Sequence, residues 1–431
     1  MADRENLPTK AVTRDVAVPT ERRGSLVTRG LIAVQENNNR ELTYKDGHGI
    51  AKDHAQTATW FRKAAEQGDA KAQEELGLMY LSGRGVEQDD VQAVYLFRKA
   101  AEQEHSSSQV LLGSMYAEGR GVEQDNALAV YWYRKAADQG DALGQCRLGF
   151  MYQNGRGVEQ DDAQSMYWFR KAAEQGDLSA QLRLGLMYRE GRGVEQDDVR
   201  AVYWYRKAVE QGDAKAQFFL GDSYEKGRGV EQDDVQAVYW YRKAAEQGDE
   251  SAQFVLGYSY EKGCGVEQDD VQAGYWYRKA AEQGNASAQS FLGIMYANGR
   301  GVEQDDAQAV YWFHEAAEQG DPHAQSSLGM MYEKGRGVEQ NDELAVFWGR
   351  KGAEQGSALG QLIIGCMYHG GRGVSKDEGQ AVYWLRKAAE QGDTLAKRVL
   401  EGLGRAADDS NGGHSHLSGR FQNNNIWLSK G

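Results

Sequence analysis

Cysteine and proline are scarce in this sequence of 431 residues, and each occurs only three times. The cysteines, Cys146, Cys264 and Cys366, are too few and too scattered for a disulfide framework, which favours a reducing compartment. Glycine, by contrast, occurs 53 times. This imbalance is typical of many helices that end at glycine, because glycine accepts the left-handed conformation that stops a helix.

Basic residues are also in deficit, with 50 Lys and Arg against 64 Asp and Glu and a formal net charge of -14. An acidic surface repels a phosphate backbone, so we expect no nucleic-acid partner. No apolar run approaches the roughly 20 residues that a membrane span requires. The N-terminus, MADRENLPTK, resembles neither a signal peptide nor a transit peptide. We therefore expect a cytoplasmic protein without a membrane span.

Residue sets typical of catalysis or cofactor binding are lacking. The recurring loop GRGVEQDD has neither the GK[ST] ending of a phosphate-binding loop nor the spacing of acids in a calcium loop. The eight histidines form no HExxH motif, and only the pair His414 and His416 could ligate a metal weakly. No Ser-His-Asp or Cys-His set can be assembled. The sequence thus predicts no enzyme, no metal and no cofactor.

The dominant feature that is present is a period of 36 residues. The tripeptide GRG recurs at this step from Gly83 to Gly371, with Cys264 once in place of arginine, and the run AEQG keeps the step from Gly68 to Gly392. Nine full units span residues 69–392, with a half unit on either side. We therefore divide the chain into an N-terminal segment 1–43, largely disordered or capping, an array 44–404, and a flexible tail 405–431.

Each unit is predicted to form two helices. In residues 213–248, the first is AKAQFFLGDSYEK and the second contains AVYWYRKAAEQ, each with apolar residues on one face. Asp233 and Asp249 stand at N-cap positions, and glycine follows each helix. Because one pair cannot bury both of its faces, the units must stack. The expected fold class is all-α, an α/α superhelical solenoid of tandem 36-residue helix-loop-helix repeats.

Three recurring residues need a specific explanation. Gly221 and its equivalents lie inside a helix, where glycine is costly, so we expect a neighbouring helix to approach closely and the Trp-Tyr pair of the second helix to use the room. The arginine of GRG could bind carboxylates of a partner, or it could pair with the loop acids of its own array. We expect the second. Asp89 and its equivalents are expected to cap the following helix.

The string AxAQxxLGxMYxxGRGVxxDxxxAxxWYRKAAEQG closely resembles the Sel-one-like repeat (SLR) family, relatives of the tetratricopeptide repeats. The resemblance covers residues 44–404. It implies a right-handed superhelix whose first helices line a concave face, and a role as an adaptor that assembles protein complexes or binds peptides. Some secreted members of the family are cysteine-rich, with a disulfide in each repeat, and this chain lacks those cysteines.

Differences between repeats concentrate on the first helix, at Glu74, Glu75, Leu78, Leu81 and their equivalents. This variable stripe lies off the predicted core stripe of Ala72, Leu76 and Tyr80, so it is a candidate ligand face. Filling of contacts between adjacent first helices is the alternative, and alanine at Phe218, Phe254 and Tyr258 should separate the two. The candidate residues are Arg147, Arg183, Arg189, Phe218, Phe219, Asp222, Phe254, Val255, Tyr258, Phe291 and Ile294.

Three functions remain open on these grounds. The first is a non-catalytic scaffold that binds a protein or peptide along the concave face. The second is a microbial effector that acts on host proteins, and the third is a repeat-family hydrolase.

The tails add two apolar segments, LVTRGLIAV at 26–34, where a capping helix or strand is expected, and a C-terminal stretch with Phe421 and residues 426–428. The oligomeric state is open, and a monomer is compatible with the sequence.

Overall fold

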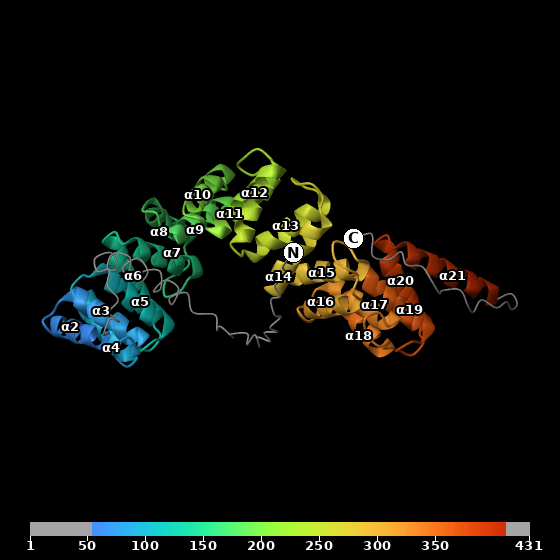
Figure 1. The fold of residues 1–431 in the computed structure, drawn as a ribbon, viewed down its shortest axis with the longest axis horizontal. Helices are drawn as coiled ribbons and strands as arrows, with labels where there is room; N and C mark the ends of the chain where they lie inside the picture. Colours follow the sequence, from blue (N-terminus) through green and yellow to red (C-terminus); the bar gives the residue numbers. More distant parts are fainter. Residues whose placement is uncertain (1–53, 411–431) are drawn as a thin grey trace, which may run out of the picture. The chain divides into compact units, whose positions relative to one another are not determined.

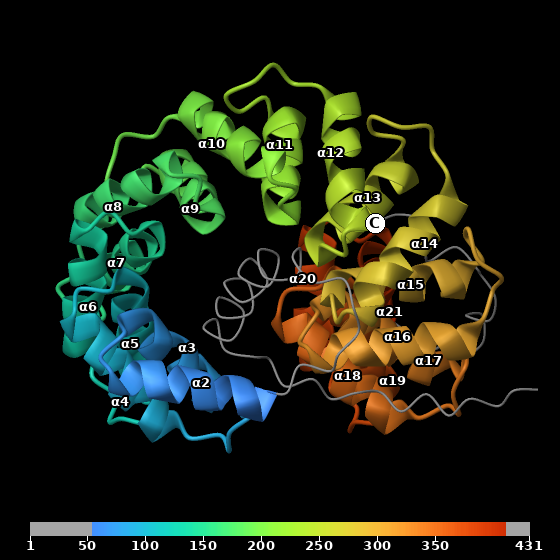
Figure 2. The ribbon, with the colours of Figure 1, turned by 60° about the vertical axis from the view of Figure 1, so that its left-hand side comes forward.

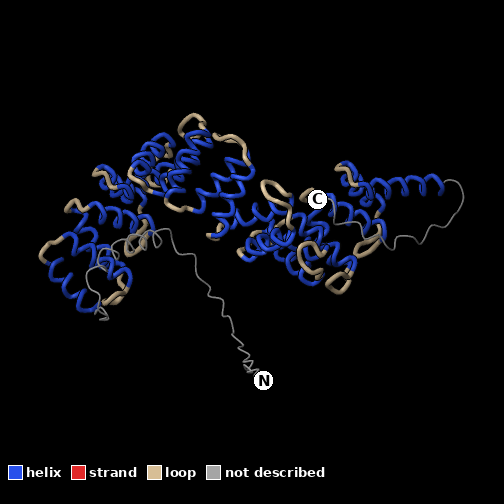
Figure 3. Tube along the Cα trace, turned by 45° about the horizontal axis from the view of Figure 1, so that its top comes forward, coloured by secondary structure: helices blue, strands red, loops and turns tan. Residues whose placement is uncertain are grey.

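The computed structural model describes residues 54–410, and within that range every regular element is an α-helix (Figures 1 and 3). The chain forms two compact units, residues 1–160 and 161–431. The predicted all-α solenoid of 36-residue helix pairs is confirmed. The predictions for residues 1–53 and 411–431, including the two apolar segments and the His414–His416 pair, lie outside the described residues.

The helices of the first unit alternate between second and first helices of successive repeats. They are α2 (His54–Glu66), α3 (Ala70–Ser82), α4 (Asp90–Glu102), α5 (Ser106–Glu118), α6 (Asn126–Asp138) and α7 (Ala142–Asn154).

The second unit continues the same alternation. Its helices are α8 (Asp162–Glu174), α9 (Leu178–Glu190), α10 (Asp198–Glu210), α11 (Ala214–Lys226), α12 (Asp234–Glu246), α13 (Glu250–Lys262), α14 (Asp270–Glu282), α15 (Ala286–Asn298), α16 (Asp306–Glu318), α17 (Pro322–Lys334), α18 (Asp342–Glu354), α19 (Ala358–Gly370), α20 (Glu378–Glu390) and α21 (Thr394–Ser410). The last helix therefore runs past Gly404, where the repeat pattern ends.

The helix ends follow the predicted capping chemistry. Asp89 accepts hydrogen bonds from the backbone N–H groups of Val91 and Gln92, at 2.9 and 3.0 Å, and so satisfies two of the free donors at the start of α4. Gly83 ends α3 in the left-handed conformation, with φ of 66°. Both predictions are confirmed, and they account for most of the loop sequence GRGVEQDD.

The second glycine of GRG is required by a close backbone approach. Gly121 has a positive φ of 65°, and a Cβ built on it would collide with the carbonyl oxygen of Asp90, the first residue of α4. Only glycine combines that conformation with that proximity. The loop of each repeat is thereby pressed against the start of the second helix one repeat earlier.

The glycine inside each first helix provides room for an aromatic ring, as expected. A Cβ on Gly221 would lie 2.7 Å from Cδ1 of Tyr241 in α12. The ring that uses this space belongs to the tyrosine of the Trp-Tyr pair, and Tyr241 is almost completely buried. In the repeat that contains Gly329, the aromatic residue is replaced by Gly349, and the two glycine backbones approach each other directly.

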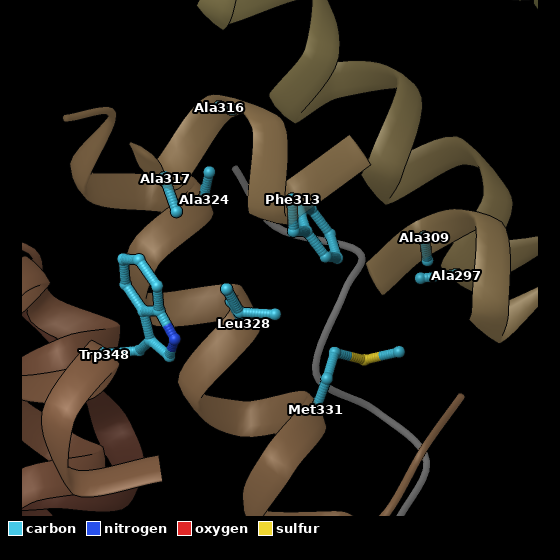
Figure 4. Close-up of a cluster of buried hydrophobic side chains, with 9 residues drawn as sticks. All are labelled: Ala297, Ala309, Phe313, Ala316, Ala317, Ala324, Leu328, Met331 and Trp348. Atoms are coloured by element: carbon cyan, nitrogen blue, oxygen red, sulfur yellow. The ribbon is translucent and has the colours of Figure 1, made fainter. Parts of the chain in front are cut away.

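The tryptophan of the pair packs against the preceding repeat. Trp348 of α18 lies with Ala316 and Ala317 of α16 and with Leu328 of α17 in one buried cluster (Figure 4). Trp276 of α14 does the same with residues of α12 and α13. Adjacent repeats are thus joined through this side chain, which is why a single helix pair cannot bury its own apolar surface.

A row of buried glutamines also joins adjacent repeats. Nε2 of Gln253 in α13 donates to the carbonyl oxygen of Ala245 in α12, at 3.1 Å, and its Oε1 accepts from Nε2 of Gln283, at 2.7 Å. The same pair of bonds recurs at Gln289, Gln325 and Gln361. The invariance of the glutamines in AQ and AEQG therefore has a structural cause, because both polar ends of a buried amide need partners.

The arginine of GRG pairs with an acid of its own array, as expected. Nη2 and Nε of Arg336 donate to the two carboxylate oxygens of Asp306 in the preceding repeat, and the same bidentate bond joins Arg120 to Asp90 and Arg372 to Asp342. These hydrogen bonds hold the pKa of Asp342 below its ordinary value. Bidentate geometry makes such a pair stronger than an ordinary surface ion pair.

Cys264 stands where the arginine that would pair with Asp234 is expected. We expect Cys264→Arg to raise the free energy of unfolding by about 0.5–1 kcal/mol, the range of a well-oriented, partly exposed ion pair. Urea denaturation at low salt measures the change. The gain should vanish in Cys264→Arg combined with Asp234→Asn, and an equal gain in both variants would contradict the pairing.

Candidate functional site

All eleven candidate residues lie on first helices, and ten of them belong to the second unit. Arg147 lies on α7 of the first unit, whereas the others are on α9, α11, α13 and α15. Within the second unit, α9, α11 and α13 follow the inner side of the curve of helices, and α10, α12 and α14 follow the outer side (Figure 2). The ten residues therefore occupy neighbouring helices on one side of this unit.

The phenylalanines of the stripe form half-buried aromatic contacts. Phe219 stacks on Tyr205, with ring centroids 5.5 Å apart, and Phe218 lies 5.6 Å from Tyr241. In the next repeats, Phe254 contacts both Tyr277 and Phe291, each with ring centroids 5.8 Å apart. These four side chains thus join first helices to buried tyrosines of the core, which is the packing role that the sequence left open for them.

Charged groups surround the aromatic residues at the α9–α11 contact. The guanidinium of Arg189 lies 4.8 Å from the ring centroid of Phe219, and its Nη1 is 4.0 Å from Oδ2 of Asp222. Asp222 is buried and also pairs with Lys226 and, at 3.9 Å, with Arg228. The negative charge of this buried carboxylate is balanced by cations of the array itself. Asp222 is therefore the centre of an ion network within the array.

Tyr258 differs from the other candidates in its exposure. It is 39% exposed, and among the described residues it is the only large apolar side chain of a first helix that is exposed. Nζ of Lys262 lies 5.6 Å from its ring centroid. Val255 and Ile294, which belong to the same stripe, are half-buried. Tyr258 therefore presents an aromatic surface that packing within the chain leaves uncovered.

Two buried tyrosines donate to glutamates of the stripe. The hydroxyl of Tyr241 donates to Oε2 of Glu225, and that of Tyr277 to Oε2 of Glu261, each at 2.8 Å. Burial, followed by the charge of the facing glutamate, raises the pKa of both tyrosines far above the ordinary value. Glu261 is buried and is also paired with Arg300 at 3.5 Å.

Two arginine candidates are half-buried. Arg147 of α7 has its Nε buried without a hydrogen-bond partner, and its charge acts on Tyr133, whose pKa is nevertheless raised by burial. Arg183 lies half-buried on α9. Neither is placed by the described contacts beside the Tyr258 surface.

Part of the predicted stripe belongs to the core, which corrects the sequence analysis. Glu74 and Leu81 are both buried, so the stripe does not lie wholly off the core. Oγ of Ser108 on α5 donates to Oε2 of Glu74 on α3 at 2.9 Å, and Nδ1 of His105 lies 3.2 Å from the same oxygen. The reason is that this position faces the next first helix, a contact that the periodicity of one helix does not encode.

A second exposed surface was missed by the repeat comparison. The second helices carry an exposed tyrosine at the same position of successive repeats, at Tyr95, Tyr131, Tyr167, Tyr203, Tyr239, Tyr275, Tyr311 and Tyr383, with Phe347 in the remaining one. A lysine one turn later lies over several of these rings. A comparison of differences between repeats does not detect these tyrosines, because the position hardly varies. An aromatic residue on the polar face of each second helix could nevertheless have predicted the exposed row.

Residues 54–410 contain neither a cluster of metal-ligand residues nor a helix suited to span a membrane. No group of three or more His, Cys, Asp or Glu in that range could hold a metal ion. No helix there is both long and apolar enough to cross a membrane.

Comparisons with known proteins agree with the repeat register. A family model for the Sel1 repeat matches residues 42–69 and then nine consecutive segments, from 70–105 to 358–393. Among solved structures, a protective antigen of uropathogenic Escherichia coli strains with an SLR fold is 41% identical, has a TM-score of 0.71, and is matched over 85% of this chain and 80% of its own. A Sel1 repeat protein from Oxalobacter formigenes is 32% identical, with a TM-score of 0.49 and coverage of 92% and 97%. No curated protein matches the chain significantly.

Proposed function

Because the chain belongs to the Sel1 repeat family, we propose that it is a non-catalytic scaffold that binds a protein or peptide through the first helices of its second unit. Sel1 repeats generally serve as protein-interaction scaffolds and are typically non-catalytic. The binding surface comprises the first helices α9, α11, α13 and α15, which carry ten of the eleven candidate residues.

The exposure of Tyr258 is the observation that carries this proposal. The conserved polar side chains of the repeats are engaged within the array, as caps, glutamine pairs and arginine-aspartate pairs. Tyr258, by contrast, is an exposed aromatic residue of the variable stripe, which also holds half-buried apolar residues, and Lys262 lies over its ring. Binding hot spots have this composition, an aromatic anchor within a charged rim.

The structure sharpens the choice of variant for testing the proposal. Phe218 and Phe254 contact buried tyrosines, so alanine at those positions would disturb folding as well as any binding. Tyr258→Ala removes the exposed ring alone. Tyr239→Ala is the matched control, because Tyr239 is also about half exposed but lies on a second helix.

We expect Tyr258→Ala to weaken binding of the captured partner by at least about 30-fold, which corresponds to the loss of a hot spot of about 2 kcal/mol. Affinity capture from a lysate of the source cells identifies the partner, and titration with the purified partner gives the dissociation constant. Tyr239→Ala should bind as the wild type does. Equal affinity of all three proteins would refute a binding surface at Tyr258.

A second candidate function is a role in the contact between a bacterium and its host. It is supported by the 41% identical relative, which is a protective antigen of uropathogenic Escherichia coli strains. Treatment of intact source cells with a protease that does not enter them tests this role. Complete resistance of the protein, together with capture of partners only from the source cell, would refute it.

A further inference from the structure

The tryptophan position of the second helices is buried or half-buried wherever a preceding repeat is described. Trp168, Trp276 and Trp348 are buried, and Trp348 packs on Ala316 and Ala317 of the preceding repeat and on Leu328 of its own repeat (Figure 4). In α4, Leu96 takes this position and is buried against Ala58 and Ala65 of α2. In the repeats of Leu96, Trp276 and Trp348, part of the cover comes from the second helix of the repeat before.

Trp60 holds the same position in α2, the first described helix, and it is 70% exposed. Residues that would cover it from the repeat before precede His54 in the sequence, as α2, α12 and α16 precede Leu96, Trp276 and Trp348. An indole exposed to this extent leaves most of a large apolar surface in water, and burying it would be favourable. Among residues 54–410, the face of α2 that carries Trp60 is thus left exposed.

The sequence at the opposite end of the array argues against a second copy of the chain as the group that covers the Trp60 face of α2. In α21, Lys397 and Glu401 stand where other first helices have the paired glutamine and the glycine that admits an aromatic ring, and both are exposed. A following second helix could not pack there as in the other repeats. Head-to-tail stacking would bring α2 of one molecule onto this polar helix of another, and the ring of Phe61 would meet a Glu401 side chain.

The chain itself supplies an apolar segment on the correct side of Trp60. Residues 26–34, LVTRGLIAV, contain five large aliphatic side chains in an otherwise polar stretch of sequence. The residues between Val34 and His54 could span tens of ångströms at roughly 3.3 Å per residue, far more than the width of a helix pair. We propose that residues 26–34 pack against the exposed Trp60 face of α2 and close the N-terminal end of the array.

Limited proteolysis of the full chain by trypsin tests the contact, because Arg29 lies within the segment and Arg14 lies outside it. We expect Trp60→Ser to speed cleavage after Arg29 by about tenfold and to leave cleavage after Arg14 unchanged, since local burial restrains a cleavage site. Tyr95→Ser is the matched control, because it removes an exposed ring from the outer side of α4. It should leave both rates unchanged.

The same contact is tested from the other side by Leu31→Ser with Ile32→Ser, which alters no residue of the array. These substitutions should speed amide hydrogen exchange in α2 by about tenfold. The proposal would be overturned if trypsin cleaved after Arg29 at the same rate in the wild type and in Trp60→Ser, and if amide hydrogen exchange in α2 were unchanged in the Leu31→Ser, Ile32→Ser variant. It would also be overturned if the molar mass halved in Trp60→Ser while cleavage after Arg29 stayed unchanged, because a second copy would then be the occupant.

Discussion

Gly221→Ala is expected to lower the free energy of unfolding of the second unit by about 2–3 kcal/mol. The new Cβ would lie 2.7 Å from Cδ1 and 2.8 Å from Cε1 of Tyr241, which is closer than carbon atoms approach in proteins. Tyr241 is almost completely buried and its hydroxyl is bonded to Glu225, so the ring cannot move away without loss elsewhere. Overpacking of this kind costs about 1–3 kcal/mol or more and exceeds the gain in helix propensity of about 1 kcal/mol.

Gly402→Ala in α21 is the matched control, because a Cβ on Gly402 would meet no atom within 4 Å. That variant gains helix propensity without a clash and should be neutral or more stable by up to about 1 kcal/mol. Urea denaturation followed by circular dichroism measures both variants. Equal stability of Gly221→Ala and Gly402→Ala would contradict the view that Gly221 is needed to make room for the ring of Tyr241.

Alkaline pH is expected to destabilise the second unit strongly, by about 4 kcal/mol at pH 11. Burial raises the pKa of Tyr205, Tyr241 and Tyr277 in the folded state, and Asp222, Glu225 and Glu261 face these rings. The unfolded chain, in which a tyrosine has its ordinary pKa near 10, releases these protons first. Stability is therefore complete below pH 10 and falls as the pH rises, by about 1.4 kcal/mol per tyrosine at pH 11.

The pH dependence of the free energy of unfolding between pH 8 and 11 measures this effect. Tyr241→Phe should reduce the loss by about one third, because one of the three buried phenols is removed. The same substitution at the exposed Tyr239 is the control for loss of a phenol. A free energy of unfolding that stays constant up to pH 11 would show that these hydroxyls are not buried as described.

The period of 36 residues predicted the fold because it repeats local signals that act over one helix turn. The caps at Asp89 and Asp233, the glycine that ends α3, and the room at Gly221 all follow from backbone chemistry within a repeat or between its two helices. Pairing of the GRG arginine with an acid of the array was also predictable, since acids recur at a fixed distance from it. Which acid it reaches was fixed only by stacking.

The candidate site was less predictable, because exposure depends on the neighbouring repeat. Glu74 and Tyr258 both belong to the variable stripe, yet Glu74 is buried against α5 and Tyr258 is exposed. Trp60 and Trp168 both begin the run WFRKAAEQG, yet Trp60 is exposed and Trp168 is buried. A helical pattern defines the faces of a helix, but it does not state which face a neighbour covers.

The bonds between repeats join each repeat only to its immediate neighbours, and this has a consequence for how such genes change length. The glutamine-glutamine and arginine-aspartate bonds span a separation of 30 residues, the bonds from a buried glutamine to a backbone carbonyl of the preceding repeat span 8, and the arginine-tyrosine bonds span 18. Deleting or duplicating one interior period recreates every one of these junctions with the same partners. Unequal recombination between near-identical repeats should therefore yield shorter and longer arrays that still fold, so that the number of first helices can change without any new interface having to evolve.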